Sequence, residues 1–376
     1  MKLKLIIPLL ALCCSAASGQ ELSGYASLMP STILVEPGSL NYNQALLHNR
    51  LNFHWEIAES WRFDAGLRNR FIIGSEEMLS PSEIAGDNGL ADLSWNIADG
   101  RNHVLNSAFD RLAVAFEKDK WKISLGRQRV NWGQTFVWNP NDIFNTYSFF
   151  DFDYPERPGC DALRTTYFHS ETSSTELAVA ASPLRGRSTV AMLHRWNRSG
   201  VDYQVIAGQM SHSDIVAGGA VTGEFRGINL RAEASGFYPL EGDERLVVAL
   251  SFGADYVFPS ALMLQAEVLY NNAGSGASGN GLFDLYSAPL SAKRLSISET
   301  NLFAQASYPI TPRLNASLSG MMFVDVEALY GGLSADYSLA SNLDLSVIAQ
   351  YFHAAGGSAL GDMRMLLAFA RLKYSF

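Results

Sequence analysis

The sequence has few cysteines, and it has no long apolar segment after its first fifteen residues. Three cysteines occur among 376 residues, and two of them, Cys13 and Cys14, lie inside the N-terminal apolar segment. A chain without that segment retains only Cys160, which excludes an intramolecular disulfide. No later segment approaches the roughly 20 apolar residues that a membrane-spanning helix needs. A helical membrane protein is therefore excluded as well.

Basic charge is also scarce. The chain carries 28 Lys and Arg residues against 37 Asp and Glu residues, and its net charge is −9 at pH 7. This acidity argues against a nucleic-acid partner and suits a cell-surface protein. No low-complexity linker divides the chain, so we predict one domain over residues 20–376.

The N-terminus has the pattern of a secretory signal peptide. Residues 1–4 form a short basic region, residues 5–14 are apolar, and Ala17, Ser18 and Gly19 offer small side chains for cleavage. The apolar run is too short to span a bilayer. We therefore predict a signal peptide over residues 1–19; the alternative is a buried N-terminal helix.

The last eleven residues alternate between two files of side chains, which a strand places on opposite faces. One file carries Arg371 and Lys373, whereas the other is wholly apolar and ends in Tyr374 and Phe376. A soluble edge strand can show this alternation too. In an exported chain without a spanning helix, it favours the closing strand of an outer-membrane β-barrel, with lipid on one face and a wet lumen on the other.

The same two-residue period recurs along almost the whole chain. We predict an all-β fold: one closed antiparallel transmembrane barrel of about eighteen strands (range 16–20), with both termini on the periplasmic side. A barrel of this size can leave a water-filled lumen. The expected strands lie near residues 22–34, 44–57, 60–73, 107–117, 120–130, 161–169, 174–182, 188–197, 201–210, 213–221, 227–238, 245–258, 260–271, 298–310, 312–324, 328–339, 341–352 and 363–376.

The most distinctive motif is Gly-Arg-Gln-Arg-Val-Asn-Trp-Gly-Gln at residues 126–134, followed by Trp-Asn-Pro-Asn-Asp at residues 138–142. At this point the sequence resembles outer-membrane channels of the phosphate-selective and alginate-export porin type. The resemblance is sharp over about residues 126–170 and diffuse elsewhere. It implies a diffusion channel without specifying the solute. The Tyr374 and Phe376 terminus also resembles the C-terminal signal that barrel insertion machinery reads.

The arginine motif conflicts with the phase of its own strand. Trp121, Ile123 and Leu125 set a lipid-facing file that, continued strictly, would place Arg127 and Arg129 in hydrocarbon at roughly 2–4 kcal/mol each. We predict a bulge near Gly126 that turns both arginines into the lumen. There they would pair with Asp142 or Asp151. The alternative is that the strand ends early and the arginines lie at the outer interface.

Several other arginines fall on inward files, mostly in the first half of the chain. Such a wall would attract anions into the pore. Alternatively, these arginines pair with inward acids such as Glu176, Glu233 and Glu267 and stiffen the barrel. The predicted pore-lining or constriction residues are Arg62, Arg68, Arg70, Arg111, Arg127, Arg129, Arg164 and Asp142.

Residues 131–159 are too long for a plain turn, and loops of this length inside a compact fold are usually functional. We interpret them as an inward-folded loop that narrows the pore; an aromatic extracellular lid is the alternative. The second long segment, residues 74–106, is mostly polar and is expected to be an extracellular excursion.

No catalytic or metal-binding pattern stands out. The seven histidines lack metal-ligand spacing, and the small-residue run at 274–279 lacks the strand–turn–helix context of a dinucleotide site. Residues 211–214, Ser-His-Ser-Asp, supply the residue types of a membrane hydrolase without the arrangement of a triad. We predict a non-enzymatic channel for small polar or anionic solutes in the cell outer membrane, without cofactor or metal. The alternative is an export conduit or scaffold barrel, and the oligomeric state stays open.

Overall fold

A computed structural model of the chain describes residues 19–36, 40–75, 79–87, 89–150, 156–182, 188–240, 242, 245–274, 290–355 and 361–376. Three sequence predictions lie largely or wholly outside these residues: the signal peptide, of which only Gly19 is described, the partner role of Asp151, and most of the small-residue run at 274–279.

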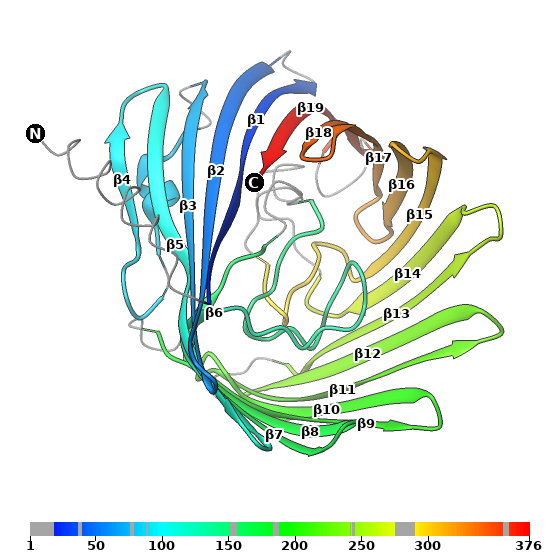
Figure 1. Cartoon of the computed structure of the whole chain (residues 1–376). Coiled ribbons are helices and arrows are strands. Elements are labelled where there is room, and N and C mark those ends of the chain that lie inside the picture. Colours follow the sequence, from blue (N-terminus) through cyan, green and yellow to red (C-terminus); the bar gives the residue numbers. More distant parts are fainter. Residues whose placement is uncertain are drawn as a thin grey trace, which may run out of the picture.

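Eighteen antiparallel strands form a closed barrel, as the sequence predicted (Figure 1). Each strand pairs with the next along the chain, and β1 closes the ring by pairing with β19. A nineteenth strand, β4 (Ser94–Asp99), pairs with β5 alone. The barrel strands are β1 (Gln20–Glu36), β2 (Leu40–Ala58), β3 (Trp61–Gly74), β5 (His103–Lys118), β6 (Trp121–Gln128), β7 (Cys160–Ser170), β8 (Ser173–Ala180), β9 (Thr189–Arg198), β10 (Val201–Met210), β11 (Asp214–Phe225), β12 (Ile228–Pro239), β13 (Val247–Val257), β14 (Met263–Asn271), β15 (Thr300–Thr311), β16 (Leu314–Phe323), β17 (Ala328–Ala340), β18 (Leu343–Ala354) and β19 (Met363–Ser375).

The outer face of the barrel is apolar. In β19, Leu366, Leu372 and Tyr374 are exposed, whereas Leu367 and Phe369 on the alternate file are buried. Exposed large apolar side chains recur on most of the barrel strands. An apolar surface of this extent on a closed barrel is a lipid-facing belt, because every backbone group of the wall is already paired.

The start of β1 and the end of the chain lie side by side at the end of the barrel that carries the tight turns. Gly24 and Phe376 exchange backbone hydrogen bonds of 2.9 Å in both directions. The strand expected over residues 213–221 is present as β11, which keeps the number of strands even. The described part of the chain contains one short helix, α2 (Pro81–Ala85), and no helix long and apolar enough to cross a membrane.

The barrel wall has an irregularity between β5 and β7. Strand β6 pairs with β5 only over Leu112–Lys118, and it ends at Gln128, where the chain leaves the wall. Beyond this point β5 pairs with β4 instead. The segment predicted to be an extracellular excursion therefore contributes a strand beside β5, at the level where β6 is missing.

The bulge predicted near Gly126 is wrong. The register of β6 runs without a shift against both β5 and β7, although Gly126 has φ +124°. The shift lies instead in β5, at Asp110, where Gly66 and Leu67 of β3 oppose Arg111 and Phe109. Arg127 thus keeps the file of Leu125, which is 63% exposed on the outer face.

Candidate functional site

Residues 129–150, here called the constriction segment, fold into the barrel and reach the far wall. Their side chains and backbone contact β8, β12, β14, β15, β17 and β18. Figure 1 shows this chain, in the cyan-green part of the colour bar, inside the ring of strands. The inward-folded interpretation is therefore correct for these residues, and the extracellular lid is not.

The tip of the constriction segment is held by Glu267 of β14. This carboxylate accepts backbone N–H bonds from Phe136 at 2.8 Å, Val137 at 3.0 Å and Trp138 at 2.8 Å. It also accepts the Ser251 hydroxyl at 3.0 Å. All four partners are donors, which matches an ionised carboxylate that can only accept. Glu267 thus fixes three consecutive residues of the tip.

A second carboxylate, Glu233 of β12, binds the flanks of the same tip. It accepts the backbone N–H groups of Gln134, Thr135 and Asn141, the last at 3.1 Å, and the Thr135 hydroxyl at 2.9 Å. Glu233 and Glu267 are both almost wholly buried. Buried charges are tolerated when they are fully hydrogen-bonded, so the two acids and the tip stabilise one another.

The start of the constriction segment is anchored by Trp132. Its indole N–H donates to Glu176 of β8 at 2.8 Å, and its carbonyl accepts from Gln204 of β10 at 2.7 Å. Glu176 also pairs with Arg164 of β7 at 2.6 Å. The side chain of Trp132 is fully buried.

Aromatic packing closes the remaining side. Phe150 meets Tyr330 and Phe352 edge-on at ring-centroid distances of 5.0 and 5.2 Å, and Phe149 meets Phe303 at 5.0 Å. Such contacts add to the burial of apolar area. The constriction segment is therefore docked by charge on one wall and by aromatic rings on another.

Asp142 does not line the open lumen, contrary to the prediction. Its side chain has no exposed surface, because the constriction segment folds around it. Burial raises the pKa of Asp142 to about 7, with Arg129 opposing the shift and Glu233 adding to it. Arg129 is close enough to act on the charge of Asp142, but among the described residues the two form no salt bridge, so the predicted pair is not made. The guanidinium of Arg129 lies 5.4 Å from the ring centroid of Tyr147.

Arg127 faces the wall irregularity rather than the lumen. It is 6% exposed and binds Asp161 of β7 at 2.7 Å, together with Asp87 and the carbonyl of Ala91. The hydrogen bonds from Arg127 and from the backbone at Gly89 and Leu93 hold the pKa of Asp87 below its usual range despite burial. The residues around Asp87 and Ala91 thus cover the arginine, which removes the cost that motivated the predicted bulge.

The other predicted arginines differ in the groups that they bind. Arg62 pairs with Asp64 at 2.9 Å, and Arg164 pairs with Glu176, so these two support the pairing alternative. Arg111 donates to the carbonyls of residues 110, 156 and 157 and holds the end of the long loop.

Arg68 and Arg70 lie on β3 directly opposite Arg50 and His48 of β2. Arg70 donates to Asn106 at 3.1 Å and to the carbonyl of Ile84 at 3.2 Å. Arg50 pairs with Asp110. An arginine-rich wall therefore exists over β2–β5, but carboxylates and carbonyls take up part of its binding capacity.

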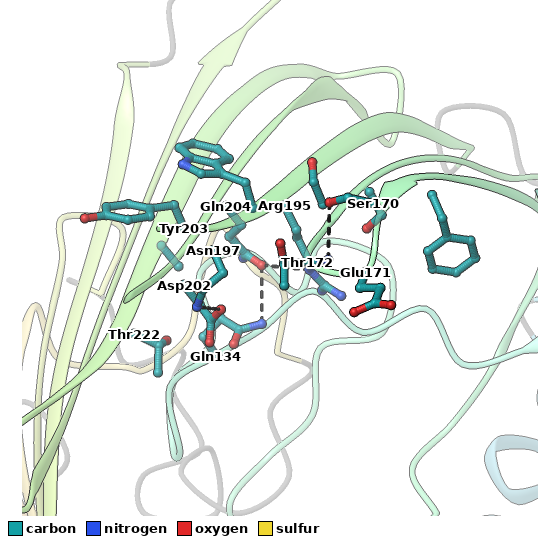
Figure 2. A pocket seen from close by; sticks show the side chains of 15 residues that line it. Gln134, Ser170, Glu171, Thr172, Arg195, Asn197, Asp202, Tyr203, Gln204 and Thr222 are labelled. Atoms are coloured by element: carbon teal, nitrogen blue, oxygen red, sulfur yellow. Dashed lines mark hydrogen bonds between the residues drawn. The ribbon is translucent and has the colours of Figure 1, made fainter. Parts of the chain in front are cut away.

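Two cavities adjoin the constriction segment. The first, of about 420 Å³, lies against β7–β11 (Figure 2). Arg195 donates to Gln204 at 3.3 Å there, and Gln134 of the constriction segment donates to the same oxygen at 3.3 Å. The second, of about 500 Å³, lies against β15–β19. Within the described ranges, no group of three His, Cys, Asp or Glu side chains is arranged to hold a metal ion.

Sequence reasoning placed Glu176, Glu233 and Glu267 on inward files but did not assign them to the constriction segment. Each acid stands among small or apolar residues on its strand, as in Gln-Ala-Glu-Val at 265–268. An acid in such surroundings on an inward file was the sign in the sequence that it could hold another segment of the chain. The partners lie between 44 and 131 residues away in sequence, so spacing alone could not reveal them.

Neither known protein families nor curated protein sequences match the chain. Solved structures do match in fold. OccAB4 of Acinetobacter baumannii aligns at a TM-score of 0.60 with 9% identity, covering 96% of this chain and 99% of that one. OpdQ of Pseudomonas aeruginosa aligns at 0.60 with 7% identity over 95% and 97% of the two chains. The outer membrane protein OprD of Pseudomonas aeruginosa aligns at 0.57 with 10% identity over 96% of each.

The chain has the closed β-barrel fold of these three structures. At these identities the similarity establishes the architecture over nearly the full length of each chain. The general part of the sequence resemblance, which is the barrel architecture, is thereby supported. The finer assignment to the phosphate-selective and alginate-export type rests on the sequence resemblance over about residues 126–170 alone.

Proposed function

We propose that this protein is a passive outer-membrane channel for small polar or anionic solutes. The observation that carries the proposal is the constriction segment: a polar, hydrogen-bonded loop that narrows the lumen of a lipid-facing barrel while leaving cavities on both sides of its tip. A barrel with a narrowed, water-accessible lumen is the structure that selective diffusion needs. The similarity to OprD, which is described as an outer membrane protein, supports the location.

The arginine-rich wall over β2–β5 is the proposed source of any anion preference. Arg68, Arg70 and Arg111 contribute to it, and Arg129 lies where the constriction segment begins. Because acids and carbonyls share these cations, we expect a modest preference rather than a strict one. Arg127 is not part of this wall.

Reconstitution in a planar bilayer tests the function. We expect an ohmic single-channel conductance, and a shifted reversal potential in a salt gradient if anions are preferred. Arg68→Ser with Arg70→Ser should reduce that preference, and Arg313→Ser, which removes an exposed arginine of the β15–β16 turn, is the control and should not. A folded barrel that carries no current would contradict the channel and favour the alternative, an export conduit or scaffold barrel.

The finer resemblance makes a separate prediction. A phosphate-selective channel should show chloride current that phosphate reduces at millimolar concentration. Absence of this effect in a conducting channel would reject the finer type and leave the general function intact. We further propose that residues 1–19 are a signal peptide, that Tyr374 and Phe376 direct membrane insertion, and that the protein is not an enzyme.

A further inference from the structure

The second cavity, against β15–β19, is lined by aromatic rings and by hydroxyl and amide groups. Its volume of about 500 Å³ falls within the roughly 300–1,000 Å³ typical of small-molecule sites. Aromatic rings enter it from the constriction segment, and hydroxyl and amide groups enter it from the strands.

The strand side is a ladder of polar, mostly uncharged residues. Because the strands are paired in register, side chains at matching positions form rows across the inner face. Successive rows lie two residues apart along each strand, and they expose hydroxyl and amide groups. The neighbouring row carries the aromatic side chains that the constriction segment covers. One row contains Gln305, Ser319 and Gln350, and the next row contains Ser317 and Ser334.

The constriction segment contributes the ring of Phe136 to the lining of this cavity. This ring is 41% exposed although it sits at the tip of a segment that is otherwise buried. Its backbone N–H is bound to Glu267 at 2.8 Å, so the residue is held in place. A fixed apolar ring facing a wet cavity is a ready surface for the apolar face of a ligand.

Gln350 supplies an independent observation. Its side chain is only 4% exposed, and its Oε1 atom has no hydrogen-bond partner among the described residues. Its Nε2 atom donates to the Tyr330 hydroxyl at 3.5 Å. A buried acceptor without a donor is unfavourable and calls for one from outside the protein. Because Gln350 lines the cavity, a ligand O–H group can supply that donor.

The charges at this cavity do not favour a strongly charged ligand. Arg371 and Asp336 both lie in the row beyond Ser334, on opposite sides of Ser346. Ser346 donates to Asp336 and accepts from Arg371 at 3.3 Å. Arg157 is stacked on the ring of Tyr147, with its guanidinium carbon 3.7 Å from the centroid. The ligand that fits this lining is uncharged and has one apolar face and several hydroxyl groups.

We propose that this cavity is a binding subsite for a neutral polyhydroxylated ring, such as a pyranose, on its way through the pore. One face of the ring stacks on Phe136, and its hydroxyl groups bond Gln350 and the serines of the strand ladder. The proposal rests on the proposed channel function for its role in passage, but the binding itself does not depend on conduction.

The test measures binding and conduction separately. Isothermal titration of maltose and glucose into the folded, detergent-solubilised protein reports binding, and bilayer current reports the channel. We expect saturable millimolar maltose binding, and a matching reduction of current. Phe136→Leu keeps the apolar bulk but removes the aromatic face, so it should weaken binding roughly 2- to 10-fold. Gln350→Met should weaken it roughly threefold to tenfold.

Thr222→Ala is the matched control, because it removes a lumen hydroxyl from the first cavity. It should leave maltose affinity unchanged. The subsite is rejected if the wild type shows no saturable sugar binding, if acetate or glycine betaine binds as tightly as maltose, or if neither cavity variant weakens binding. A silent barrel that still binds maltose would reject the channel and keep the subsite, whereas a conducting barrel without sugar binding would do the reverse.

Discussion

The Glu267 clamp allows a sharp test of how the constriction segment is held. Glu267→Gln preserves shape but replaces one acceptor oxygen by an NH₂ group, which would face backbone N–H donors. At least one of the bonds from Phe136, Val137 and Trp138 must then be lost, and the rest lose their charge. Hydrogen bonds to charged groups contribute about 1.5–3 kcal/mol each, so we expect the docked segment to lose about 3 kcal/mol or more.

A loss of that size raises the undocked population by roughly 150-fold. The barrel wall should persist, because its backbone ladders do not involve this side chain. Single-channel recording should show larger and noisier openings than the wild type, while the thermal midpoint of the barrel changes little. Glu117→Gln, at an exposed ion pair with Lys122, is the control and should behave as the wild type. Wild-type conductance and noise in the Glu267 variant would refute the clamp.

Three further predictions follow from other residues of the fold. Because burial raises the pKa of Asp142 to about 7 from 3.8, the docked segment binds more protons than an undocked one, so its stability should fall as pH rises from about 4 through 7; channel noise should follow this trend, and Asp142→Asn should weaken it. Arg127→Met leaves the carboxylates of Asp87 and Asp161 without their shared cation and should cost about 3–5 kcal/mol in urea unfolding; an unchanged midpoint would contradict the pairing. Phe376→Asp places a charge on the exposed aromatic end of the closing strand and should prevent membrane insertion in cell fractionation, whereas normal insertion would count against an assembly signal.

The sequence by itself determined the barrel. A strand repeats every two residues, so a lipid-facing file and a lumen-facing file are legible in any single strand, as in Leu366–Phe376. The strand expected over residues 213–221 followed from the requirement for an even number of strands, and the structure has it as Asp214–Phe225. Local periodicity needs no knowledge of distant partners, and this is why these predictions succeeded.

Only the tertiary structure decided what the arginine motif and the long loop do. The sequence correctly indicated that an arginine at position 127 on the outward file would be unfavourable in lipid. Its charge is paired with Asp87, forty residues earlier, and no bulge forms at Gly126. The inward course of the loop depends on Glu233 and Glu267, which lie on strands across the barrel. Closing the sheet brings such residues together, and charge pairing across a lumen leaves no period in the sequence. The tertiary contacts therefore fixed the constriction, although the strands that carry them were already legible in the chain.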